Sequence, residues 1–242
     1  MNATENTVAT APLLRRVPVV TTDEHVVKSL TWVSDGIFEI RLERGEITYS
    51  PGDCVALFAE DRIASRPYSI ASGVEDDSLG FVIRHFEGGE VTGFLATRKP
   101  GDTVKVSPPF GWFKPGHPEH PRFCFIATGT GISPFLAHLR SFPDQPPEAL
   151  LYGVRQASDA VGQEVLPQKG LHLAVSREDL EGAHRGRVTD LLDQLPLDDD
   201  IHYYLCGLDT MIDEVTIWLE AKGVAIPRIH RECFFNADVE TA

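Results

Sequence analysis

The chain has 242 residues, a formal net charge of −14 and a hydrophobic share of 42%. That share is enough for globular cores, whereas the acidic balance argues against nucleic acid as a partner, because binding phosphates needs concentrated lysine and arginine. The apolar runs are too short to cross a membrane and the first eleven residues lack the apolar stretch of a signal peptide, so we expect a cytoplasmic location and no membrane insertion.

Residues 17–106 read as short strands separated by turns rich in proline, glycine and aspartate. The expected strands are 29–34, 37–42, 54–58, 66–70, 79–85 and 103–107, with a short helix over 92–97. Many short strands at this spacing are typical of an antiparallel barrel or a sandwich.

The pattern changes after a linker over 110–121 that is dense in proline, glycine and histidine. Strands are expected at 123–127, 149–152, 172–176 and 202–206, and helices at 134–141, 188–194 and 209–222. Alternating strands and helices predict a parallel, doubly wound α/β sheet of the nucleotide-binding type. The predicted architecture is therefore an N-terminal antiparallel β-barrel domain (15–116) followed by a C-terminal α/β domain (117–242).

A glycine-rich segment, Thr128-Gly129-Thr130-Gly131-Ile132-Ser133-Pro134, lies between a buried strand and a helix. Glycines let the backbone approach an anionic group, and a helix start offers free amides to a pyrophosphate. The segment is neither the full dinucleotide fingerprint nor a phosphate loop. Taken alone, it fits a tight turn as well as a ligand site.

A second segment, Arg66-Pro67-Tyr68-Ser69, lies on an expected strand. Alternation along the strand places Arg66 and Tyr68 on one face and Pro67 and Ser69 on the other. A tyrosine ring can pack on a flat heterocycle and an arginine can neutralise a phosphate, but the same residues also suit an ordinary exposed strand.

The order of the motifs resembles the ferredoxin–NADP reductase superfamily. Arg-Pro-Tyr-Ser comes first, Gly-Thr-Gly-Ile-Ser-Pro follows at mid-chain, and Tyr204-Leu205-Cys206-Gly207 with Met211 and Glu232-Cys233-Phe234 come last. The resemblance spans residues 19–235. It implies a flavin domain followed by a nicotinamide-nucleotide domain.

For the flavin domain, the resemblance implies that Arg66, Pro67, Tyr68 and Ser69 bind the flavin, with Tyr68 stacked on its ring and Ser69 near its reactive nitrogen. Arg84, Gly89, Val91 and Thr92 match the diphosphate-binding stretch. FAD is expected rather than FMN, because most members of the family use FAD.

For the nucleotide domain, the resemblance implies that Thr128, Gly129, Thr130 and Gly131 cradle the nicotinamide-nucleotide pyrophosphate, and that Cys206, Gly207 and Met211 border the nicotinamide. Ser69, Cys206 and Glu232 are the expected catalytic residues, with Cys206 positioning the ring and Glu232 relaying protons. Phe234 or Phe235 would shield the flavin. Seven residues, 236–242, follow Phe235, so the chain departs from family members that end on an aromatic residue.

Arginines favour NADPH over NADH. The resemblance places Arg155, Arg177 and Arg187, together with Ser176, at positions that contact the 2′-phosphate, and an arginine fork fits a dianionic phosphate. Glu178 adjoins them but also occurs in family members that use NADP.

No metal site is expected. The four cysteines, Cys54, Cys124, Cys206 and Cys233, show none of the close spacing of zinc or iron–sulfur centres, and free thiols are expected. The run His117-Pro118-Glu119-His120 is nominally metal-like, but it lies in a proline-rich linker with no further ligand cluster nearby in the sequence.

The predicted function is an FAD-dependent NADPH oxidoreductase that exchanges electrons with a ferredoxin or flavodoxin-type carrier. Such carriers are usually acidic and should dock on the less acidic first half of the chain, near Arg15, Arg16, Arg62, Arg98 and Lys99. The alternatives are the reductase component of a multicomponent oxygenase, a free-flavin reductase, and a non-catalytic redox-sensing or complex subunit.

Overall fold

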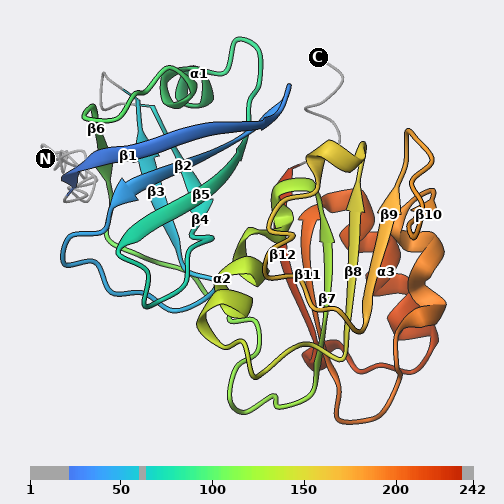
Figure 1. The fold of residues 1–242 in the computed structure, drawn as a ribbon. Coiled ribbons are helices and arrows are strands. Elements are labelled where there is room, and N and C mark those ends of the chain that lie inside the picture. The colour runs from blue at the N-terminus through green and yellow to red at the C-terminus, as the bar shows by residue number, and fades with distance from the viewer. Residues whose placement is uncertain (1–21, 60–63, 236–242) are drawn as a thin grey trace, which may run out of the picture.

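The computed structural model describes residues 22–59 and 64–235, except for the side chain of Phe235. Two six-stranded sheets lie side by side, each formed by one half of the chain (Figure 1). The last strand of the first sheet ends at Val106 and the first strand of the second sheet begins at Phe123. The predicted boundary at 116/117 lies between these two strands.

The first sheet is antiparallel, in the order β4-β3-β6-β1-β2-β5. Its elements are β1 (Asp23–Ser34), β2 (Ile37–Glu43), β3 (Cys54–Phe58), β4 (Ser65–Ser69), β5 (Ser78–Arg84), the helix α1 (Glu90–Ala96) and β6 (Thr103–Val106). The two edge strands converge where the Ala71 amide donates to the Gly80 carbonyl at 2.8 Å, so the sheet curls toward a barrel. Alternate apolar residues such as Phe38, Ile40 and Leu42 fill its interior.

The second sheet is parallel throughout, in the order β10-β9-β8-β7-β11-β12. Its elements are β7 (Phe123–Thr128), the 3₁₀ turn Gly129–Ile132, α2 (Ser133–Ser141), β8 (Ala149–Val154), the 3₁₀ turn Ala157–Asp159, β9 (Leu171–Val175), β10 (His184–Arg185), the 3₁₀ helix Val188–Gln194, β11 (His202–Leu208), α3 (Asp209–Ala221), the 3₁₀ turn Ile226–Arg228 and β12 (Ile229–Phe235). The antiparallel first half and parallel α/β second half confirm the predicted fold class.

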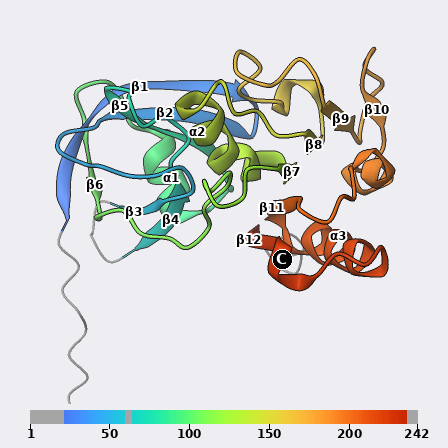
Figure 2. The ribbon, with the colours of Figure 1, turned by 90° about the horizontal axis from the view of Figure 1, so that it is seen from below.

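The two helices of this half cover opposite faces of the parallel sheet (Figure 2). α2 packs on the face toward the first sheet, in a core that also contains Ile37 and Val82 from the first half of the chain. α3 packs on the other face with the 3₁₀ helix Val188–Gln194. Because the two halves share a buried apolar core, the relative position of groups along their boundary is fixed by packing.

The structure differs from the sequence-based elements in several places, among them the short strand β10, which was not expected. Residues 229–235 form a strand, although their His-Arg-Glu-Cys run hid it in the sequence. Residues 188–194 form a 3₁₀ helix rather than an α-helix, and the first strand begins at Asp23 rather than Ser29. Among the described residues, no helix has the length and apolar character needed to cross a membrane.

Candidate functional site

A cavity of about 1110 Å³ lies where the two halves of the chain meet. Its walls come from β4, the end of β5, the start of α1, the segment 110–113 and β12. Ten of the residues expected to serve the flavin or catalysis line it: Arg66, Pro67, Tyr68, Ser69, Arg84, Gly89, Val91, Thr92, Glu232 and Phe234. Residues from distant parts of the sequence thus converge on one space.

The segment Arg66–Ser69 lines this cavity with all four of its residues. β4 is an edge strand with no neighbour on one side. The cavity can therefore extend around its free edge, so that residues from both faces of the strand line it. The Tyr68 ring is largely shielded from water, and burial raises the pKa of its hydroxyl to about 12. Tyr68 therefore presents a neutral aromatic wall at physiological pH.

Three polar side chains meet in the wall next to Tyr68. Ser69 Oγ lies 3.5 Å from Glu232 Oε2, Cys54 Sγ lies 3.2 Å from Ser69 Oγ, and Cys54 Sγ lies 3.7 Å from Glu232 Oε1. Burial raises the pKa of Glu232 to about 7, although the Cys54 and Ser69 hydrogen bonds partly counteract this rise. Glu232 can therefore gain or lose a proton near neutral pH, as a proton relay requires.

Cys54 was not expected at this site. It pairs with Ser69 across β3 and β4, and that pairing brings its thiol to the serine hydroxyl. Burial, reinforced by the nearby Glu232 carboxylate, raises its pKa to about 12, so it stays a protonated thiol. A lone cysteine at the start of a strand carries no sequence signal for this contact.

Cys206 lies behind the cavity wall instead of lining it. Its side chain is fully buried, and it pairs in register with Glu232 across β11 and β12. Burial raises the pKa of its thiol well above the usual range, so it is not a thiolate. Its predicted part in positioning the nicotinamide would have to act through neighbouring backbone.

Arg84 and the start of α1 form another stretch of the wall. Gly89 precedes the helix, and a Cβ at this position would come within 2.4 Å of Thr92 Oγ1 and 3.0 Å of the Phe86 carbonyl oxygen. Val91 and Thr92 are buried at the first turn and line the cavity. The absence of a side chain on Gly89 keeps this backbone tightly folded against the cavity.

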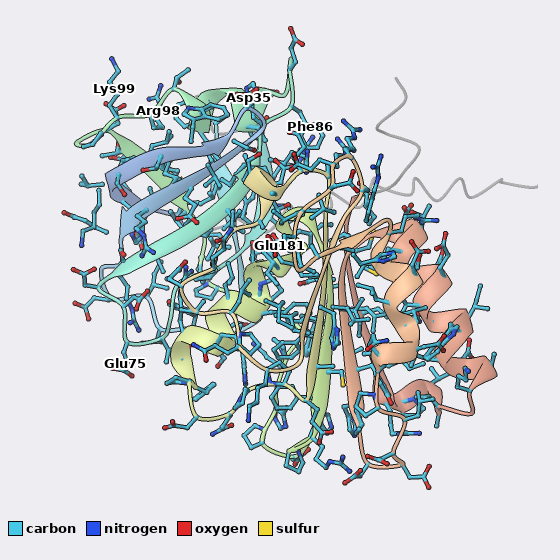
Figure 3. All side chains as sticks on the ribbon, turned by 45° about the vertical axis from the view of Figure 1, so that its right-hand side comes forward. Asp35, Glu75, Phe86, Arg98, Lys99 and Glu181 are labelled. Atoms are coloured by element: carbon cyan, nitrogen blue, oxygen red, sulfur yellow. The ribbon has the colours of Figure 1, made fainter. Side chains whose placement is uncertain are left out.

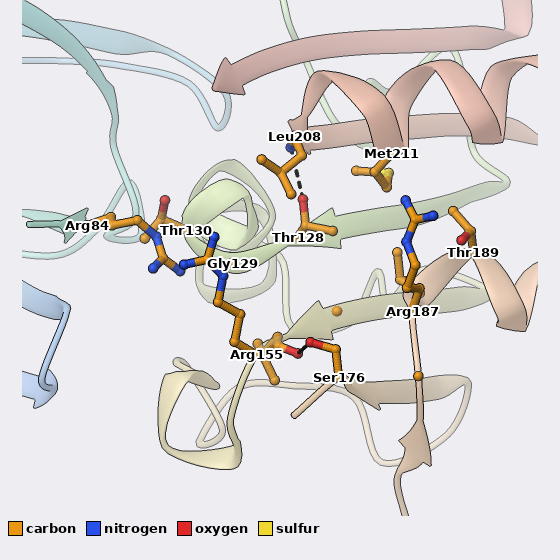
Figure 4. A pocket seen from close by; sticks show the side chains of 14 residues that line it. Arg84, Thr128, Gly129, Thr130, Arg155, Ser176, Arg187, Thr189, Leu208 and Met211 are labelled. Atoms are coloured by element: carbon orange, nitrogen blue, oxygen red, sulfur yellow. Dashed lines mark hydrogen bonds between the residues drawn. The ribbon is translucent and has the colours of Figure 1, made fainter. Parts of the chain in front are cut away.

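A second, smaller cavity of about 170 Å³ opens beside the carboxyl ends of β7, β8 and β11 (Figure 4). Thr128, Gly129 and Thr130 line it, together with Arg84, Arg155, Ser176, Arg187 and Met211. Gly129 has φ +53°, a left-handed conformation that favours glycine, and allows the chain to turn sharply after β7. This is the edge at which open α/β sheets bind ligands.

Gly131 and Gly207 line neither cavity, and their role is close packing. A Cβ on Gly131 would lie 2.4 Å from the Cys206 carbonyl oxygen, and one on Gly207 would lie 2.1 Å from Thr128 Oγ1. Thr128 Oγ1 in turn accepts a hydrogen bond from the Leu208 amide at 3.0 Å. The glycines therefore bring the turn after β7 against the end of β11, which shapes the cavity without lining it.

The arginines of the smaller cavity point in different directions. Arg155 points toward Arg84 and Gly129, whereas Arg187 lies across the cavity near Met211 and Thr189 (Figure 4). Arg187 Nη2 also pairs with Glu214 Oε1 at 2.9 Å. Arg177 is exposed and does not line the cavity. The three predicted phosphate contacts are thus not gathered at one point.

Arg84 and Thr130 line both cavities. The Arg84 guanidinium lies close to the turn after β7, since a Cβ on Gly129 would be 3.5 Å from its Nη2. The Arg84 side chain, which comes from the first sheet, therefore lies at the boundary between the two cavities.

The mouth of the larger cavity carries aromatic residues that were not singled out in the sequence. Trp112 is 99% exposed and Phe110 49% exposed, and both line the cavity. Two exposed aromatics in one loop beside a cavity are unusual for a protein surface and indicate contact with a ligand or a partner. Their signal was the dense run Phe110-Gly111-Trp112-Phe113, which was assigned only to the linker.

Of the five cations expected to dock a carrier, the structure describes Arg98 and Lys99. Arg98 and Lys99 lie far from Phe86 at the cavity, at the opposite end of the first half (Figure 3). Arg98 is also engaged within the chain, over the Phe94 ring at 4.1 Å and beside Asp102 at 4.0 Å. Arg15, Arg16 and Arg62 lie outside the described residues, as do 236–242 and the side chain of Phe235, so the expectations about them stay predictions.

Comparison with known families divides the chain in the same way as the structure. An oxidoreductase FAD-binding domain matches residues 20–114, and an oxidoreductase NAD-binding domain matches residues 125–216.

Among curated relatives, the toluate 1,2-dioxygenase electron transfer component of Pseudomonas putida is 29% identical over 78% of this chain and 60% of its own length. The anthranilate 1,2-dioxygenase electron transfer component of Acinetobacter baylyi is 30% identical over 80% of this chain and 60% of its own length. The chain therefore spans about 60% of these relatives.

Among solved structures, a ferredoxin NADP+ reductase from Neisseria gonorrhoeae shares the fold with a TM-score of 0.79 at 18% identity, over 88% of this chain and 99% of that one. The two matched domains, their order and the shared fold agree with each other. The chain belongs to the ferredoxin–NADP reductase superfamily of flavin- and nicotinamide-binding oxidoreductases.

Proposed function

We propose that this chain transfers a hydride from NADPH to bound FAD and delivers the electrons to a ferredoxin-type carrier of an oxygenase system. The observation that carries the proposal is the junction of the two cavities. A large cavity with an aromatic wall and a titratable carboxyl group adjoins a smaller cavity at the nucleotide-binding edge of the parallel sheet, and Arg84 and Thr130 line both.

The larger cavity fits a flavin dinucleotide. Its volume of about 1110 Å³ slightly exceeds the roughly 300–1,000 Å³ of most small-molecule sites, as a long ligand requires. Tyr68 offers a flat neutral ring, and Arg84 offers positive charge beside the α1 backbone. The FAD-binding domain match supports FAD over FMN.

A bound flavin would supply the chemistry that takes up a hydride and gives out single electrons. Tyr68 would hold its ring by stacking, and Ser69 Oγ would offer a hydrogen bond at the same wall. Glu232 lies 3.5 Å from Ser69 Oγ and holds or releases a proton near pH 7, matching the proton that accompanies flavin reduction. Phe234 also lines this cavity and would shield a bound flavin.

The smaller cavity supports NADPH through a division of roles among its arginines. Arg84 and Arg155 point toward Gly129, where the pyrophosphate would lie against the turn after β7 (Figure 4). Arg187 and Ser176 line the cavity farther from this turn and suit the 2′-phosphate. Arg177 is exposed and lies outside the cavity lining, so it would contact the nucleotide only at its periphery.

The acceptor is proposed from the relatives. Those quoted above are electron transfer components of dioxygenases, and another, from Pseudomonas putida, is the ferredoxin–NAD(P)+ reductase component of a naphthalene 1,2-dioxygenase system, 28% identical over 79% of this chain. These names favour the reductase-component function over a free-flavin reductase or a non-catalytic subunit. A flavodoxin carrier is the second candidate within the same activity.

The purified chain provides the test. We expect a visible spectrum of oxidised flavin, FAD as the released cofactor, and NADPH oxidation with both ferricyanide and a [2Fe–2S] ferredoxin as acceptors. A flavin that is lost on gel filtration, with turnover only when free flavin is added, would support the free-flavin reductase instead. Flavin retention without NADPH turnover would refute catalysis.

A further inference from the structure

Three histidines meet at the end of the parallel sheet opposite the cavities. His120 lies in the linker before β7, His202 begins β11 and His230 is the second residue of β12. All three are half-buried, and none lines either cavity. The proposed oxidoreductase chemistry therefore makes no use of them.

The imidazoles are close enough to share one ligand. One nitrogen from each of the three rings lies within 4.8 Å of the others. His202 Nδ1 and His230 Nε2 face each other at 2.9 Å, and the His120 ring stacks on His202 with centroids 3.6 Å apart. A hydrogen bond between two neutral imidazoles uses one N–H and one lone pair. When the donor ring changes tautomer and carries its proton on its other nitrogen, both facing nitrogens offer a lone pair to a cation between them.

The protonation state of the three rings favours a cation. Burial lowers the pKa of His120, His202 and His230, and the neighbouring histidines lower it further. His230 is affected most, with a pKa of about 4. Burial and the neighbouring rings thus disfavour the protonated form, and a metal ion binds the neutral imidazole.

Other polar side chains surround the three histidines. His120 Nδ1 is 2.7 Å from the Tyr204 hydroxyl, an outer partner of the kind that fixes a ligand histidine. His117 lies next to His120, with ring centroids 5.7 Å apart, but it stands outside the group of nitrogens within 4.8 Å and would have to move inward to offer a fourth nitrogen. Asp198 and Asp200 lie nearby in the turn that leads into β11, where they pair with Arg122.

We propose that His120, His202 and His230 form a site for a divalent transition-metal ion of the zinc class, with His117 or a water molecule as the fourth ligand. Imidazole is a preferred ligand of Zn²⁺, Co²⁺, Ni²⁺ and Cu²⁺, and three histidines with one open position are a known zinc arrangement.

The adjustment needed on binding is small. Zinc–nitrogen bonds of about 2.0–2.1 Å place neighbouring nitrogens roughly 3.4 Å apart in a tetrahedral site. The largest present separation, up to 4.8 Å, must therefore shrink by roughly 1.4 Å at most. His120 must rotate out of its stack on His202, and its position in the linker, outside the sheet, allows that rotation.

Such an ion would fasten the linker between the two halves to β11 and β12. β12 also carries Glu232, so the same strand connects the metal site to the wall of the larger cavity. Because an ion that binds only the folded state stabilises it, metal should raise the Tm of the chain. This inference does not depend on the proposed electron transfer.

The test uses the full, flavin-containing chain after removal of metal with a chelator. Titration with Co²⁺ should show one equivalent bound with visible d–d absorption, and Zn²⁺ should displace it and raise the Tm. His120→Asn, His202→Asn and His230→Asn should each weaken Co²⁺ binding by about tenfold or more, and Tyr204→Phe should weaken it less. His172→Asn, on β9 and outside the cluster, is the matched control.

Two results would overturn the proposal. One is the absence of stoichiometric Co²⁺ or Zn²⁺ binding at millimolar metal. The other is binding that His172→Asn weakens as much as the cluster variants do. If a cluster variant fails to fold, X-ray absorption at the zinc edge of the wild-type chain still decides, because the proposal requires scattering from at least three imidazoles.

Discussion

Glu232 is a carboxyl group whose charge opposes folding above neutral pH. Burial raises its pKa from 4.5 to about 7, so the folded chain binds this proton more tightly than the unfolded chain does. Its contribution is therefore most favourable below pH 4.5, becomes unfavourable as the pH rises from 4.5 to about 7, and is constant above that. At about 1.36 kcal/mol per pH unit, the full difference is at most about 3.4 kcal/mol.

Glu232→Gln removes the charge while keeping the shape. At pH 8 we expect the flavin-free variant to be more stable than the wild type by roughly 2 kcal/mol, the upper value being reduced because Glu232 is partly exposed and the amide must also be desolvated. At pH 4.5 the difference should fall to about 0.4 kcal/mol or less, because Glu232 is then neutral in the folded chain and only half ionised in the unfolded chain. Urea unfolding at both pH values measures this, with Glu220→Gln, exposed on α3, as control.

The reasoning about this carboxyl group fails if the stability difference between wild type and Glu232→Gln is the same at pH 4.5 and pH 8. It also fails if Glu220→Gln shows the same pH dependence. In the flavin-bound chain, the same variant should slow NADPH oxidation and flatten its pH profile near 7, because the titrating group is gone.

Three further substitutions test the cavities. Arg187→Ala should raise the KM for NADPH about tenfold or more and leave that for NADH unchanged, because a lost charged hydrogen bond costs roughly 1.5–3 kcal/mol; equal effects of Arg185→Ala, which removes an exposed arginine paired with Asp179, would contradict the assignment. Tyr68→Ala should weaken flavin binding roughly 10–100-fold while Tyr68→Phe retains it, as flavin fluorescence titration can show, since stacking on a ring is worth about 1–3 kcal/mol. Gly131→Ala should lower the free energy of unfolding, measured with urea, by about 1–3 kcal/mol, because its Cβ would meet the Cys206 carbonyl oxygen at 2.4 Å. Gly93→Ala is the control: this glycine lies in open space on α1, so its substitution should not destabilise the chain in the same assay.

The sequence predicted the two halves because each has a strong periodic signal. Short strands between turn residues indicated the antiparallel sheet, and apolar strands alternating with helices indicated the parallel one. β12 escaped prediction because it is an edge strand whose exposed side carries Arg231 and Cys233, so its polar residues read as a loop. Edge strands lack the continuous apolar run that marks a central strand of a parallel sheet.

The candidate site was predicted less completely than the fold, for a physical reason. Motifs report residues that are adjacent in sequence, whereas contacts such as Cys54 with Glu232 depend on pairing between β3 and β4 and between the two halves. The histidine cluster is the clearest example, because no further ligand lies near His120 in the sequence except His117 and Glu119 of the same linker. His202 and His230 reach it only through the parallel pairing of β11 with β12.

The position of Arg84 in both cavity walls would make flavin binding and nicotinamide-nucleotide binding interdependent. A guanidinium already neutralised by a flavin diphosphate has less charge to offer a second pyrophosphate, so each nucleotide would change the affinity for the other by the same factor. The oxidised nicotinamide nucleotide carries its pyrophosphate to the same cation. The reduced nucleotide carries the same pyrophosphate, so a bound flavin would weaken the binding of both forms alike and would shorten the time that either stays bound.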